Sequence, residues 1–224
     1  MSIIIGLVWL LVGAISRSQA RLIESLPTTK CNLAKPGLVQ VEGKAAGKDR
    51  ISSIVFRFPC YICQAELMPK GRRAITRKQQ STRFKVQDGS GTVVVDPEGA
   101  DFDLKRSVRV IVQEARILEH EGEGNPEDLA RRLREYGYGT FRGIIHESNL
   151  RPNEPVLVIG TASEVPEAPQ EPAHILIRKE GNGPLYIAES SRQGAVAESR
   201  KWAKIGLTTG LILIALGVLL VLSA

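Results

Sequence analysis

Both ends of this chain are apolar and carry no charged side chain, while the stretch between them holds every acid and base. Met1–Ser16 and Ile205–Ala224 contain no Lys, Arg, Asp or Glu, whereas the interior from Arg17 to Lys204 contains all 30 basic and 24 acidic residues. Apolar, charge-free segments of this length are typical of membrane helices. The partition therefore predicts a polar domain, residues 17–204, between two transmembrane helices, residues 1–16 and 205–224.

The C-terminal segment has the length of a complete span, because 20 residues of α-helix rise about 30 Å. The N-terminal segment has 16 residues, slightly fewer than the usual minimum of about 17, so a secretory signal peptide is the alternative. It lacks a basic n-region and a small-x-small cleavage site, which favours a retained helix. Gly206 and Gly210 have the spacing that lets membrane helices pack closely, within a helix pair or between copies in a homo-oligomer.

The charges beside the two apolar segments predict on which side of the membrane the domain lies. Basic residues follow the first segment and precede the second: Arg17, Arg21, Lys30, Lys35, Arg192, Arg200, Lys201 and Lys204. By the positive-inside rule, we expect a two-pass integral membrane protein with its domain in the cytoplasm and both termini outside. The odd number of cysteines, three, agrees with a reducing compartment.

The interior domain has a strand-like pattern for most of its length. Short runs rich in Val and Ile are bounded by Gly, Pro and Asp, and several of them alternate between apolar and polar residues. We expect strands at Gly37–Ala45, Ile51–Phe58, Tyr61–Leu67, Phe84–Gln87, Thr92–Asp96, Val108–Gln113, Pro155–Ala162, His174–Arg178 and Leu185–Ala188. Asp88–Gly91 has the composition of a hairpin turn between two of them.

One amphipathic helix is predicted within this β pattern. Asn125-Pro126-Glu127-Asp128 supplies an N-cap, a proline at the first helical position and acids at the positive end of the helix dipole. Leu129 and Leu133 follow at helical spacing, and Glu119–Asn125 before the helix is expected to be a solvated loop. The domain is therefore predicted to be β-rich (α+β), with an OB-like (oligonucleotide/oligosaccharide-binding-like) β-barrel as the expected topology.

A pattern of Val, Gly and Ala occurs twice in the domain. Val39-x-Val41-x-Gly43-x-Ala45 matches Val156-x-Val158-x-Gly160-x-Ala162 position for position. Alternating valines followed by a glycine suit a strand that bends where backbones approach closely. We expect two such strands in one small barrel, with coincidence as the alternative.

The order of these segments resembles the GIDE domain, the membrane-flanked module of the RING-type E3 ubiquitin ligases of the mitochondrial outer membrane. The resemblance is carried by Leu26–Lys30, Gly37–Ala45, Phe58–Tyr61, Asp88–Gly91, Val93–Ala100, Glu147 and Pro155–Ala162. It implies a domain held beside a bilayer, and it implies that the ubiquitin transfer of the family resides in a RING. In the mitochondrial relatives the domain faces the intermembrane space, which differs from the cytoplasmic side predicted here.

A RING needs eight zinc ligands in paired Cys/His spacings. This sequence offers six candidates, namely Cys31, Cys60, Cys63, His120, His146 and His174. None follows the Cys60-x-x-Cys63 pair at knuckle spacing, so we expect no metal site, no cofactor and no catalytic residue, as in a RING-less, prokaryotic-style member. Residues three apart in a strand face opposite sides, so we expect Cys60 and Cys63 to point apart, with only one of them buried.

The basic run between Pro69 and Arg83 is the most pronounced charge feature of the domain. It contains no acid and six cations: Lys70, Arg72, Arg73, Arg77, Lys78 and Arg83. Beside a membrane these side chains could hold anionic lipid headgroups at about 1 kcal/mol per cation, and a solvated hairpin loop is the alternative. Nucleic acid is disfavoured as a partner because no aromatic residues interleave the cations.

One leading function and two alternatives follow. Because no acid, base, metal or nucleophile set converges in the sequence, we expect a membrane-anchored, non-enzymatic interaction module that presents a GIDE-like domain to an unidentified protein partner at the membrane surface. The family resemblance implies the first alternative, ubiquitin-type protein transfer (E3 ubiquitin ligase-like) together with a separate RING partner. Regulation of a neighbouring membrane protease is the second.

Overall fold

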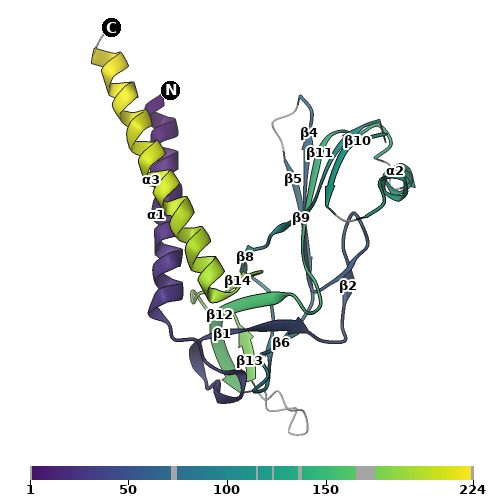
Figure 1. Ribbon diagram of the computed structural model, residues 1–224, viewed down its shortest axis with the longest axis vertical. Coiled ribbons are helices and arrows are strands. Elements are labelled where there is room, and N and C mark those ends of the chain that lie inside the picture. Colours follow the sequence, from purple (N-terminus) through teal and green to yellow (C-terminus); the bar gives the residue numbers. More distant parts are fainter. Residues whose placement is uncertain are drawn as a thin grey trace. The chain divides into compact units, whose positions relative to one another are not determined.

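The computed structural model describes residues 2–71, 75–114, 116–122, 124–135, 138–164 and 175–222 (Figure 1). The chain divides into a helical unit, Met1–Thr29 with Ser190–Ala224, and a β-rich unit, Lys30–Glu189. The helical unit contains α1 (Ser2–Ser25) and α3 (Arg192–Leu222). The β-rich unit contains a 3-10 turn (Cys31–Leu33), α2 (Pro126–Glu135) and the strands β1 (Gly37–Ala46), β2 (Ile51–Ser52), β3 (Pro59–Cys60), β4 (Ile62–Pro69), β5 (Thr76–Ser81), β6 (Phe84–Gln87), β7 (Thr92–Val95), β8 (Asp101–Asp103), β9 (Arg106–Gln113), β10 (Arg116–Gly122), β11 (Arg142–Leu150), β12 (Pro155–Glu164), β13 (Ile175–Arg178) and β14 (Tyr186–Ala188).

The two long helices, α1 and α3, lie side by side and run antiparallel (Figure 1). Both are long and apolar enough to cross a membrane. Glycines line their contact: a Cβ on Gly206 would come within 2.6 Å of the Gly13 Cα, and one on Gly210 would lie 2.9 Å from the Gly6 carbonyl oxygen. The absence of side chains at these positions lets the two backbones approach closely.

Both helices extend beyond the apolar segments 1–16 and 205–224, and polar contacts join the extensions. The Arg192 guanidinium donates hydrogen bonds to the carbonyl oxygens of Ile23, Glu24 and Leu26 at 3.4, 3.1 and 3.2 Å, and Arg200 pairs with the Glu24 carboxylate at 2.5 Å. The last carbonyls of a helix have no intrahelical donor. Arg192 supplies that donor at the C-terminal end of α1.

A valine at Gly206 should weaken the helix pair, because its side chain would occupy the space of the Gly13 backbone. We expect Gly206→Val to destabilise the pair by about 1–3 kcal/mol, seen as a lower unfolding midpoint of the full chain in detergent micelles. Leu211→Val is the control, since Leu211 is 61% exposed, and its midpoint should stay near that of the unsubstituted chain. Equal midpoints for the two variants would contradict the glycine contact.

Five strands of the β-rich unit close into a barrel, in agreement with the predicted OB-like topology. Their order is β1-β6-β7-β13-β12, and β12 pairs back with β1. Neighbouring strands are antiparallel except β7 and β13, which are parallel. The barrel core is filled mainly by β-branched residues, including Val39, Val41, Val86, Val93, Val95, Val156, Val158 and Ile177.

The predicted turn between β6 and β7 is held by one carboxylate. Asp88 accepts hydrogen bonds from the backbone N–H groups of Ser90 and Gly91, at 2.8 and 3.2 Å, and from that of Cys31 at 2.8 Å. Partial burial raises the pKa of Asp88, but the Ser90 hydroxyl, which donates to the carboxylate at 2.7 Å, and these backbone N–H groups together lower it to about 2. The Asp-Gly-Ser-Gly sequence thus forms the turn that its composition predicts.

Two glycines leave room for neighbouring atoms in the barrel: Gly43 for the backbone of β6, and Gly160 for the side chains of Ile177 and Leu185. They belong to the pattern that occurs twice in the sequence. Gly43 in β1 lies opposite Val156 in β12, and Gly160 in β12 lies opposite Val39 in β1. The two matching segments are therefore paired strands of the one barrel. A Cβ on Gly43 would lie 2.5 Å from the carbonyl oxygen of Gln87 in β6.

Gly43→Ala should destabilise the barrel, because the added methyl group meets backbone that cannot move without breaking the β1–β6 pairing. We expect a loss of about 1–3 kcal/mol in the free energy of unfolding, measured by denaturant titration of the full chain in detergent. Gly139→Ala is the matched control, since the nearest atom to its Cβ, on Arg134, is 3.9 Å away. A Gly43→Ala chain as stable as the control would refute the close approach.

The second sheet has five strands in the order β10-β9-β11-β4-β5. α2 covers one of its faces, and the residues buried there include Ala65, Leu67, Val108, Val110, Val112, Leu129, Leu133 and Ile145. β5 is one of the two edge strands, β10 being the other, and every residue of β5 is exposed. The helix predicted from Asn125 onward is thus confirmed and covers a sheet.

Several local predictions are wrong. The expected strand Ile51–Phe58 ends at Ser52, where the chain turns and Arg57 adopts a φ of 61°. Glu119–Asn125 is not all loop, because β10 continues to Gly122 and pairs with β9. In addition, β3, β5, β8 and β11 form where the sequence predicts no strand. The remaining strand predictions agree to within a few residues, except that His174, expected to begin one, lies outside the described residues.

Candidate functional site

A loop, Ser53–Phe58, packs against the face of the five-stranded sheet that α2 covers, and hydrogen bonds hold both of its ends. The Ser53 N–H donates to the Phe58 carbonyl oxygen at 2.8 Å, and the Phe58 N–H donates to the Ser53 hydroxyl at 3.1 Å. In the middle of the loop, the Val55 N–H donates to the Glu147 carboxylate at 2.6 Å and the Ile54 N–H to the Cys63 sulfur at 3.4 Å. We call this segment the 53–58 loop.

The carboxylate that holds the loop is buried. Glu147 in β11 is 1% exposed, and besides Val55 it accepts a hydrogen bond from the Asn149 side-chain amide at 3.0 Å. A buried carboxylate is tolerated only where donors replace its hydration. The contact between Glu147 and the 53–58 loop therefore stabilises both: the Val55 N–H satisfies the buried carboxylate, and the carboxylate fixes the position of the loop.

Cys60 and Cys63 lie together beneath this loop, so the prediction that they point apart with only one buried is wrong. Both are fully buried, and their thiols share a hydrogen bond that lowers the pKa of Cys60 and, together with burial, raises the pKa of Cys63. The cause is Tyr61, which is a bend between β3 and β4. Strand alternation restarts at this bend and brings both sulfurs to the same side.

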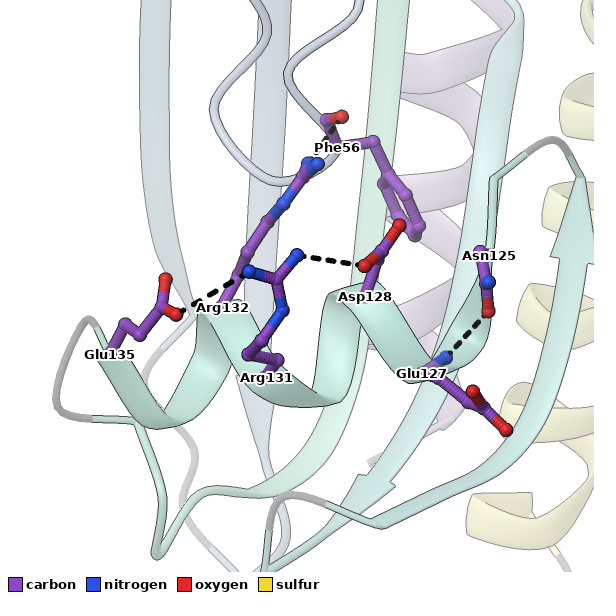
Figure 2. Close-up of polar contacts among 7 residues, drawn as sticks. All are labelled: Phe56, Asn125, Glu127, Asp128, Arg131, Arg132 and Glu135. Carbon is purple, nitrogen blue, oxygen red and sulfur yellow. Dashed lines mark hydrogen bonds and ion pairs between the residues drawn. The ribbon is translucent and has the colours of Figure 1, made fainter.

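α2 is connected to the loop by an arginine (Figure 2). The helix begins with an Asn125 side-chain oxygen that accepts the Glu127 N–H at 2.9 Å, the N-cap that the sequence predicts. On the side that faces the loop, Arg132 donates to the Phe56 carbonyl oxygen at 2.6 Å. Arg131 instead pairs with Asp128 at 2.8 Å, within the helix.

Between α2, the 53–58 loop and the strands β4 and β5 lies a groove of about 280 Å³. Its floor is apolar and is made by Ile54, Val55, Leu67, Leu129, Leu133 and Ile145. Its polar lining consists of three cations, Arg57, Lys78 and Arg132, together with Gln80 and Tyr138. No acid is among the described residues that line it. We call it the α2 groove.

The structure distributes the predicted basic run over different surfaces. Lys78 donates to the Tyr138 hydroxyl at 3.2 Å and joins the α2 groove, while Arg77 pairs with Glu66 at 2.8 Å. Arg83 pairs with Asp96 at 2.7 Å, and Lys70 is exposed after the end of β4. Arg72 and Arg73 lie outside the described residues. Anionic-lipid contact by this run stays a prediction.

The remaining titratable candidates do not converge. His146 and Glu147 are neighbours in β11 and face opposite sides of the sheet; burial and the nearby arginines lower the pKa of His146. Burial and Glu154 raise the pKa of Glu189, in a different part of the unit, to about 7. In the parts of the chain that the structure describes, no three His, Cys, Asp or Glu side chains are placed to hold a metal ion.

Glu147→Ala should release the 53–58 loop, because the Val55 N–H and the Asn149 amide lose their acceptor in a buried site. We expect a loss of about 2–4 kcal/mol in the free energy of unfolding, together with faster hydrogen exchange of the Val55 amide. Glu66→Ala removes the exposed partner of Arg77 on the same sheet and should cost less than about 1 kcal/mol. Unchanged exchange at Val55 in the Glu147 variant would show that the carboxylate does not hold the loop.

Comparison with known proteins agrees with the architecture. No curated protein and no solved structure gives a significant match to the chain. A family model described as "GIDE: E3 Ubiquitin ligase" matches residues 66–222, a stretch that runs from β4 through α2 to the end of α3. Since this match covers more than half of the chain, the protein belongs to the GIDE family.

Proposed function

We propose that this chain is a membrane-tethered interaction module that binds a protein partner in the α2 groove. The observation that carries the proposal is the chemistry of the groove: an apolar floor beside three cations, at the edge of a sheet. Protein-binding sites commonly combine an apolar centre with a polar rim. The two membrane-length helices at the ends of the chain support a place of action beside a bilayer.

Site-specific photocrosslinking in native membranes tests this proposal. Benzoyl-phenylalanine at Gln80, which lines the groove, should give a discrete adduct with a protein that mass spectrometry identifies. The same group at Gln87, exposed on the barrel strand β6, is the control and should not capture that protein. Capture of no protein at Gln80, or of the same proteins at both positions, would contradict groove binding.

A second candidate is participation in ubiquitin-type transfer, and the description of the matching family supports it. In this candidate the chain acts together with a separate RING protein, which supplies the eight zinc ligands. Copurification of a zinc-containing RING protein with the full chain from native membranes would favour this candidate, and the absence of such a protein from the copurified material would count against it.

We also propose that the β-rich unit faces the cytoplasm. The basic residues beside the helices, on the domain side of both apolar segments, support this orientation. Protease should leave the domain intact in right-side-out cells and digest it in inverted vesicles. Digestion in intact cells would place the domain on the outer side.

A further inference from the structure

The edge of β5 presents backbone groups beside the α2 groove. The Thr82 N–H donates to the Tyr61 carbonyl oxygen at 2.9 Å, which fixes the phase of the antiparallel β4–β5 pairing. Hydrogen-bonded and non-hydrogen-bonded pairs alternate in such a ladder. The backbone N–H and C=O groups of Arg77, Gln79 and Ser81 therefore point away from β4, toward the side on which no described strand pairs with β5.

The side chains of β5 divide between the two faces of the sheet. Lys78 and Gln80 line the α2 groove, whereas Arg77 contacts Glu66 and Gln79 accepts a hydrogen bond from the Gln64 side chain on the opposite face. A strand added to β5 would repeat this alternation, because side chains of neighbouring strands stay in register. Every second side chain of the added strand would then lie on the groove side.

We propose that the partner binds as an extended acidic segment that adds to β5 as a sixth strand, with an apolar side chain in the α2 groove and carboxylates beside Lys78 and Arg57. This inference rests on the proposed function and specifies the chemistry of the partner. Strand addition takes its affinity from backbone hydrogen bonds and its specificity from pockets for alternate side chains. The edge of β5 offers the backbone groups, and the adjoining α2 groove offers a pocket.

The size and charge of the groove select this occupant. At about 280 Å³ the groove is smaller than the usual small-molecule site of about 300–1,000 Å³, so it suits one or two side chains. Its cations favour carboxylates, and its floor favours an aliphatic anchor. A second copy of the chain is disfavoured, because β5 would bring Arg77 and Lys78 against the same cations of its partner strand.

A designed peptide tests the inference with the full chain in detergent micelles. The probe is fluorescein-labelled Thr-Glu-Thr-Leu-Thr-Glu-Thr, which places both carboxylates and the leucine on one face of a strand. Its control, Glu-Glu-Leu-Thr-Thr-Thr-Thr, has the same composition without the alternation. We expect fluorescence anisotropy to show at least about tenfold tighter binding of the alternating peptide.

Substitutions at two positions of β5 test backbone pairing and charge separately. Gln79→Pro removes an outward-facing N–H without removing a bond to β4, as edge strands tolerate, and should weaken peptide binding about tenfold or more. Gln79→Ala loses the same side-chain bond, retains the N–H and should bind as the unsubstituted chain does. Independently, Lys78→Glu should lose the acidic peptide and gain affinity for Thr-Lys-Thr-Leu-Thr-Lys-Thr.

Three results would overturn strand addition. The first is equal binding of the two acidic peptides. The second is undiminished peptide binding by a folded Gln79→Pro chain, together with a Lys78→Glu chain that does not exchange its preference from the acidic to the basic peptide. The third is displacement of the probe by soluble dihexanoyl phosphatidylglycerol under conditions in which dihexanoyl phosphatidylcholine has no effect. The last result would identify an anionic lipid as the occupant. None of these results determines whether Gln80 crosslinks to a protein, so the proposed function is tested independently of strand addition.

Discussion

The pairing of β1 with β12 is the constraint on which the rest of the β-rich unit depends. These strands are separated by more than a hundred residues, and their contact closes the barrel. A chain segment inserted between two consecutive barrel strands must therefore leave the barrel and return to it. Two such excursions, β4–β5 between β1 and β6, and β9–β11 between β7 and β12, meet to form the five-stranded sheet. The sheet and its groove are thus assembled from insertions into a closed framework.

On that sheet, the buried carboxylate of Glu147 holds the loop that forms one side of the α2 groove. Glu147 needs donors because it lies among apolar side chains, and it obtains one from the 53–58 loop. The bend at Tyr61 brings Cys63 to the same loop. The loop in turn offers its Phe56 carbonyl to Arg132 of α2. Loop and helix are therefore held at set positions on the sheet, and the α2 groove is the space that remains between them.

The sequence predicts those parts of the fold that strong local signals specify. Alternating valines mark the barrel strands, Asp88–Gly91 marks the turn, and the Asn125 cap marks α2. β5 was missed because Thr-Arg-Lys-Gln-Gln-Ser contains no apolar residue, and its strand form depends on pairing with β4. The groove could not be predicted, because it joins residues from both insertions. One signal was available: Glu147 alternates with the buried Ile145, which places its carboxylate on the core face.

The charges of β5 determine which kind of strand can pair with its edge. An unprotected edge strand pairs with any exposed strand, and proteins commonly prevent this with lysines and arginines. Arg77 and Lys78 provide that protection, since they repel the same edge of another copy. The same cations attract a strand that carries carboxylates, so one feature excludes the wrong partner and selects the right one. A cationic edge beside an apolar groove is consequently what strand addition by an acidic partner requires, and a neutral edge would bind with less discrimination.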